Sequence, residues 1–216
     1  MKASITVPTS LSEVTLKQYQ KFLKIQEMNE DEMFLQTKMI EIFCGVEYKD
    51  VLSIKVLDAE RITKMLGDLF TQKPELVKSF EIDDVTYGFI PSLDDMTLGE
   101  YVDLDTFLGD WKNIHNAMNV LYRPVLQRSA ERYKIADYDT TTKDRLLDMP
   151  MDAVISSIFF FFHLGIDLSI AMSHYSQEEM AKQQVLPQDL GKSGVGMDQY
   201  MHSLRKILQD LKISLN

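Results

Sequence analysis

The longest apolar stretch constrains the fold more than any other feature, because most of its side chains must be shielded from water. It begins at Met149-Pro150, runs to about Tyr175 and contains four consecutive phenylalanines at 159–162. The twenty residues 153–172 are long enough to cross a bilayer. Polar residues recur along the stretch at spacings of four and seven and therefore share one helical face: Asp152, Ser156, His163, Asp167 and His174. Burying such groups in lipid is expensive, so we expect a central core helix, with an oligomer interface as the alternative.

This polar face combines Ser, His and Asp, the residue types of a hydrolase triad. On a helix, however, Ser156 and His163 are separated by about 10.5 Å, too far for the hydrogen bond that activates a nucleophile. His163 and Asp167 can pair across one turn, which usually marks a satisfied polar spot. The four histidines lack ligand spacing and Cys44 is the only cysteine. We therefore expect no enzyme, no metal and no cofactor; the alternative is an enzyme whose site is assembled from distant residues.

Capping signals and apolar periodicity predict helices before and after a short β region. The predicted helices cover residues 15–28, 31–44, 58–70, 97–107 and about 111–121, the last kinked or ended by Pro124. Two short strands around Asp83-Asp84 predict a hairpin at about 77–90, which packs on a helix or pairs with another chain. The polar residues 133–148, with three consecutive threonines, are expected to form a loop.

The predicted fold class is mostly α, with a single helical domain, a small β-hairpin insertion and a C-terminal amphipathic helix. The helical core domain covers residues 1–182. Residues 183–196 carry one proline and three glycines and predict a flexible linker. Residues 197–216 contain the amphipathic helix, and the sequence leaves open whether it packs in cis or in trans.

The charge of the chain is concentrated in one segment. The 33 acidic and 23 basic side chains give a net charge of −10, which argues against nucleic-acid binding. Nine of the acidic residues lie between Ser79 and Trp111, where there is no Lys or Arg, and the rest of the chain is nearly neutral. These acids are either turn residues and helix caps that face water, or a docking surface for a basic protein. The candidate partner-binding residues are Asp94, Asp95, Glu100, Tyr101, Asp103, Asp105 and Trp111.

The sequence also gives expectations about the compartment. The first residues lack the apolar stretch of a secretory signal, and a single cysteine fits a reducing environment. We therefore expect a cytosolic protein.

Several short segments of the chain stand out together: residues 7–10 with 14–19, 87–91 with 97–101, 120–124 and 149–151. In this order, and over most of residues 7–175, they resemble small and mostly helical proteins encoded among the head and tail genes of tailed bacteriophages. Some of those proteins look like tail or baseplate assembly chaperones, and others are virion components. The resemblance carries no site residue.

This resemblance implies a non-enzymatic phage morphogenesis protein that binds a tail or other virion component during assembly. The implied location is the host cytoplasm and, for a structural component, the virion. The implied partner is a phage tail or head protein, with no nucleic acid and no membrane, and a homo-oligomer is compatible with it. The alternatives are a small structural component retained in the mature virion and a general cytosolic acidic adaptor. Thirteen methionines would suit adaptable apolar contacts, although most are expected in the core.

Overall fold

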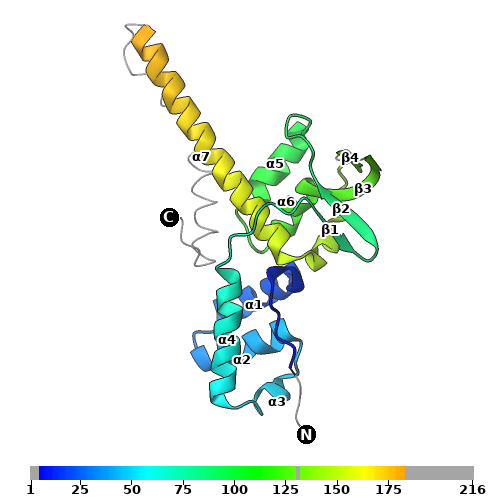
Figure 1. Cartoon of the computed structure of the whole chain (residues 1–216), viewed down its shortest axis with the longest axis vertical. Coiled ribbons are helices and arrows are strands. Elements are labelled where there is room, and N and C mark those ends of the chain that lie inside the picture. The colour runs from blue at the N-terminus through cyan, green and yellow to red at the C-terminus, as the bar shows by residue number, and fades with distance from the viewer. Residues whose placement is uncertain (1–4, 130–131, 183–216) are drawn as a thin grey trace.

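The computed structural model of the chain describes residues 5–129 and 132–182, with side chains up to residue 167 (Figure 1). The predicted linker at 183–196 and the predicted helix in 197–216 lie outside these residues and stay predictions. Figure 1 shows a lower group of helices, an upper part with a sheet, and a long helix that begins between them and projects away. The fold is helix-rich, as predicted, but its β part is larger than the predicted hairpin.

The first part of the chain forms a group of helices whose boundaries follow local sequence signals. Its elements are η1 (a 3₁₀ helix, Leu11–Glu13), α1 (Leu16–Met28), α2 (Glu32–Cys44), α3 (Tyr48–Val51) and α4 (Val56–Phe70). The predicted capping box of α1 is confirmed, because the Gln18 N–H donates to Thr15 Oγ1 at 3.2 Å and the Thr15 N–H donates to Gln18 Oε1 at 2.9 Å. Helix α2 ends at Gly45, whose φ of 64° is the predicted left-handed cap.

The predicted hairpin is confirmed, and it is half of a larger sheet. Strands β1 (Ser79–Ile82) and β2 (Val85–Phe89) meet at Asp83 and Asp84, whose φ values of 48° and 62° suit a tight hairpin turn. Strands β3 (Tyr122–Ser129) and β4 (Arg132–Ile135) extend it to an antiparallel sheet in the order β1-β2-β3-β4. The hairpin therefore gains its further strand partner from the same chain.

Two helices connect β2 to β3, and the second is shorter than the sequence suggests. They are α5 (Leu98–Phe107) and α6 (Ile114–Leu121). Helix α6 ends before Pro124, which lies inside β3 and so neither kinks nor ends the helix directly. Pro124 lacks an N–H, and its carbonyl accepts a hydrogen bond from the Ala136 N–H at 2.8 Å, just beyond β4.

The prediction of a loop over 133–148 is wrong at both ends of that segment. Its first residues belong to β4, and its last form the 3₁₀ helix η2 (Lys143–Asp148). The outer half of β3 is exposed at every residue, so it lacks the alternation that marks a half-buried strand in sequence. Gly88 helps to hold β4 in place: a Cβ there would lie 2.6 Å from Tyr133 Cε2, and the Tyr133 hydroxyl donates to the Phe89 carbonyl at 2.6 Å.

The long apolar stretch forms α7 (Met151–Lys182), and its first half is the core helix that the sequence predicts. Its buried side chains are Met151, Ala153, Val154, Ile155, Ser156, Ser157, Ile158, Phe159, Phe161 and Phe162. The start of α7 is tied to the entry of α1, because the Leu16 N–H donates to the Met149 carbonyl and the Met151 N–H to the Val14 carbonyl, each at 2.9 Å. One hydrophobic core therefore joins the helical group and the sheet. Within the described residues, no helix combines the length and apolarity that a membrane crossing requires.

Candidate functional site

Helix α5 carries most of the candidate partner-binding residues, and its start is fixed by a second capping box. The Thr97 N–H donates to Glu100 Oε2 at 2.6 Å, and the Glu100 N–H donates to Thr97 Oγ1 at 3.3 Å. Leu104 and Leu108 on the inner face are buried against the rest of the upper part. The capping box and this buried face fix which side of α5 turns toward solvent.

Glu100, one of the predicted docking residues, lies inside the fold. Its side chain is 5% exposed and forms an ion pair with Arg123 of β3, 11% exposed, at 2.8 Å between Oε1 and the guanidinium. Burial opposes the charged form, but the Thr97 hydrogen bonds and the Arg123 charge outweigh it and hold the pKa of Glu100 below its usual range. Glu100 therefore joins α5 to the sheet and is not presented to a partner.

Trp111 and Asp103 are also engaged within the chain. Trp111 is 7% exposed, and its ring lies 4.9 Å from that of Tyr19 between centroids, so it belongs to the core. The half-buried Asp103 accepts a hydrogen bond from the Tyr138 hydroxyl at 2.7 Å. Burial together with the Asp103 carboxylate raises the pKa of Tyr138, which keeps this hydroxyl protonated as a donor. Neither residue is free to anchor a partner in this conformation.

The remaining candidates are exposed and lie together with apolar side chains that the sequence did not single out. Leu98, Tyr101 and Val102 are 78%, 57% and 51% exposed. With Asp105 they follow the spacing i, i+3, i+4, i+7 and so share the outer face of α5. Asp94 and Asp95 are exposed just before the helix. We call this surface the α5 face: Asp94, Asp95, Leu98, Tyr101, Val102 and Asp105.

The carboxylates of the α5 face are not neutralised by their surroundings. Among the described residues, Asp94, Asp95 and Asp105 form no side-chain hydrogen bond and no ion pair, in contrast to Glu100 and Asp103. An apolar stripe between unpaired acids is suited to a partner that brings both apolar contact and positive charge.

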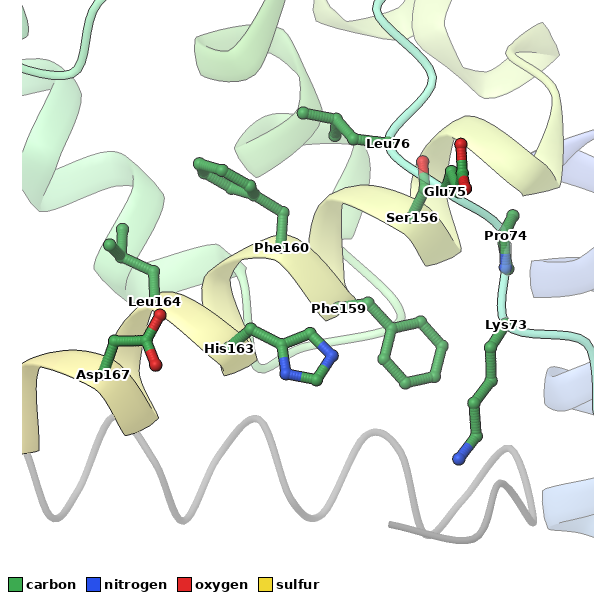
Figure 2. Close-up of a pocket in the computed structure, with 10 residues that line it drawn as sticks. All are labelled: Lys73, Pro74, Glu75, Leu76, Ser156, Phe159, Phe160, His163, Leu164 and Asp167. Atoms are coloured by element: carbon green, nitrogen blue, oxygen red, sulfur yellow. The ribbon is translucent and has the colours of Figure 1, made fainter. Parts of the chain in front are cut away.

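A shallow pocket of about 430 Å³ lies between the start of α7 and the segment that follows α4 (Figure 2). Phe159, Phe160 and Leu164 supply apolar walls, while His163 and Asp167 are exposed. The Ser156 hydroxyl accepts from the Val77 N–H at 3.1 Å and donates to the Ala153 carbonyl at 3.2 Å, so it holds the backbone. Figure 2 shows the side chains of Ser156 and His163 pointing in different directions. The pocket therefore does not bring Ser156 and His163 together as a catalytic pair.

A second hollow, of about 360 Å³, lies between α1, α2 and α4 and is lined mainly by apolar side chains such as Phe22, Leu35 and Met39. It contains no cluster of titratable groups. Within the ranges that the structure describes, no group of three or more His, Cys, Asp or Glu side chains could hold a metal ion.

Comparisons with known proteins give no match, so the function of this chain has to be inferred from its structure. No family model, curated protein or solved structure matches the chain. Of the seven residues that the sequence offered for partner binding, the structure leaves Asp94, Asp95, Tyr101 and Asp105 exposed and places Glu100 and Trp111 inside. The signal for the two missed residues, Leu98 and Val102, was their helical spacing to Asp105, seven and three residues earlier.

Proposed function

We propose that this chain is a non-enzymatic binding protein that recognises a basic partner protein through the α5 face. The observation that carries this proposal is the exposed stripe of Leu98, Tyr101 and Val102. In the sequence it is flanked by three carboxylates that pair with no described residue, in a segment without Lys or Arg. Unpaired acids speed the encounter with a basic partner, and the aromatic and aliphatic side chains supply contact area once the complex forms.

The setting that we propose is the assembly of a tailed bacteriophage, in which the chain covers a tail or other virion component until that component is incorporated. This setting is supported by the short segments within residues 7–175 that resemble, in the same order, phage head and tail proteins. A chaperone-like role also fits a surface whose affinity comes partly from charge, because such contacts form quickly and weaken as the salt concentration rises.

Affinity capture from infected cells tests this proposal. The full chain should co-purify with a basic tail or head component and be absent from mature particles. The variant Asp94→Asn/Asp95→Asn/Asp105→Asn should lose most of that partner. A matched control, Glu30→Gln/Glu60→Gln/Asp68→Asn, changes the charge equally at exposed residues of the lower helical group and should retain it.

Two results would redirect the proposal. A fixed stoichiometry of the chain in purified virions would replace the chaperone with a structural component. Equal capture of the same proteins by the triple-Asn variant and the wild type would remove the α5 face from binding.

A further inference from the structure

The outer part of the β3–β4 hairpin is a second charged surface, opposite in sign to the α5 face. Arg128, Arg132 and Lys134 are exposed, and Leu126 is 65% exposed beside them. Among the described residues none of the three basic side chains forms an ion pair. The whole stretch 126–135 contains one acidic residue, Glu131. We call Leu126, Arg128, Arg132 and Lys134 the basic hairpin.

The strand register distributes these charges over both sides of the hairpin. Ser129 pairs with Arg132 and Gln127 with Lys134, so Arg132 and Lys134 lie on one side. Arg128 pairs with Tyr133 and lies on the other side. Strand β4 pairs only with β3 within the described residues, so the ribbon is accessible along its free edge.

The two charged surfaces of one chain do not neutralise each other. Figure 1 shows the outer part of the β3–β4 hairpin on the opposite side of the upper part from α5. The described ion pair that joins β3 to α5 uses Arg123 at the inner end of the strand, and its partner is the buried Glu100. Within the described ranges no ion pair joins the basic hairpin to the α5 face.

We propose that the α5 face also binds the basic hairpin of a second copy of this chain, which would compete there with the basic virion component. This inference rests on the proposed function, because it names a second partner of the same α5 face. Three carboxylates that are unpaired among the described residues meet Arg132 and Lys134, which share one side of the hairpin and form no ion pair with a described residue. Each surface also brings exposed apolar groups, Leu98 and Val102 on one and Leu126 on the other. Because the two surfaces differ, the contact is head to tail and produces a ring or an open chain of copies.

A competing explanation for the basic hairpin is protection of the sheet edge. Charged side chains on an edge strand discourage pairing with other strands. The net charge of −10 also opposes self-association over the whole surface. Edge protection predicts no attraction between copies, so the mass of the protein in solution separates the two explanations.

Sedimentation velocity on the full chain at about 50 mM and about 300 mM salt provides the test. The wild type should associate with rising concentration at low salt and less at high salt. Arg128→Glu/Arg132→Glu/Lys134→Glu and Asp94→Lys/Asp95→Lys/Asp105→Lys should each raise the dissociation constant about tenfold or more. An equimolar mixture of the two variants should associate again, because each acidic hairpin then meets a basic α5 face. The control Lys21→Glu/Lys24→Glu/Lys64→Glu carries the same change in net charge as the hairpin variant, at exposed positions of the lower helices. At a salt concentration that screens the added repulsion, it should associate like the wild type.

The rescue by mixing also guards against unfolded variants, since neither unfolded chain could restore the other. A wild type that stays monomeric at every concentration, or a mixture that does not associate, would overturn the inference. The proposed function would survive that result if the α5 variant still lost a basic phage protein in the capture experiment. It would fail separately if the α5 variant lost no partner of any kind.

Discussion

Replacement of Glu100 by glutamine should destabilise the fold while leaving the α5 face intact. Glu100 Oε1 lies 2.8 Å from the Arg123 guanidinium, and both side chains are almost fully buried. Glutamine keeps the size of the side chain and an oxygen that can accept from the Thr97 N–H. Glu100 uses both oxygens, one for the Thr97 N–H and one for Arg123, so the amide NH2 group of glutamine then faces the Arg123 guanidinium. The substitution therefore removes the charge and the acceptor that Arg123 uses.

The loss of stability in Glu100→Gln is set by the Arg123 charge, which stays buried without its partner. Removing one partner of a buried ion pair typically costs about 3–5 kcal/mol, because the other charge stays desolvated without compensation. Among the described residues the Nε of Arg123 has no hydrogen-bond partner, and Glu100 is the one carboxylate that pairs with the guanidinium and compensates its charge. We expect a loss of about 3 kcal/mol in the free energy of unfolding, at the lower end because glutamine still accepts hydrogen bonds.

Urea unfolding of wild type, Glu100→Gln and the double variant Glu100→Leu/Arg123→Met measures this cost. The double variant should lose less stability than Glu100→Gln alone, because neither charge remains buried. A loss below about 0.5 kcal/mol for Glu100→Gln would refute the reasoning, since that is the range of exposed surface substitutions.

The pH dependence gives an independent check on the same ion pair. In the unfolded chain Glu100 has a pKa of about 4.3, and in the folded chain its pKa is lower. The stabilisation is therefore complete above about pH 4.3 and is lost as the pH falls through the folded value. The stability difference between wild type and Glu100→Gln should shrink on acidification, and a constant difference down to pH 3 would contradict the assignment.

Two further predictions concern the sheet and the end of the chain. Gly88→Ala places a Cβ within 2.6 Å of the Tyr133 ring and 2.9 Å of Val125, so it should reduce stability by about 1–3 kcal/mol in urea unfolding. An unchanged midpoint would show that Tyr133 does not lie over Gly88. Truncation after Gln184 should leave a single cooperative thermal transition, because the described core spans residues from Leu11 to Phe162. Loss of cooperativity would show that the predicted C-terminal helix belongs to the core.

Structural features that depend on residues close together in the sequence were predictable. The boxes Thr15–Gln18 and Thr97–Glu100 act within one helical turn, and Gly45 ends α2 through its own backbone freedom. Strand β3 was not predictable in the same way, because its outer half is exposed throughout and carries no periodic signal. Strand β4 does alternate between exposed and half-buried residues, but it is only four residues long. Their position depends on pairing with β2 and on the packing of Tyr133 over Gly88, which are contacts between distant residues.

The candidate site shows the same division between local and distant information. The charge count located the acidic segment, but it could not distinguish the exposed Asp105 from the buried Glu100. The difference arises because Glu100 pairs with Arg123 of β3, which follows α6 in the chain. Tryptophan is a residue type that often anchors interfaces, and only the contact of Trp111 with Tyr19 identifies it as part of the core. The apolar stripe of Leu98 and Val102 becomes recognisable once the inner face of α5 is known.

Attraction of a basic partner by the carboxylates of the α5 face should be visible in the association rate constant with the captured partner. Stopped flow measures this rate constant for wild type, Asp94→Asn/Asp95→Asn/Asp105→Asn and the control Glu30→Gln/Glu60→Gln/Asp68→Asn. The α5 variant should associate several-fold more slowly than the other two at about 50 mM salt, and the difference should shrink at about 300 mM. Equal rate constants for the three proteins at both salt concentrations would contradict this attraction.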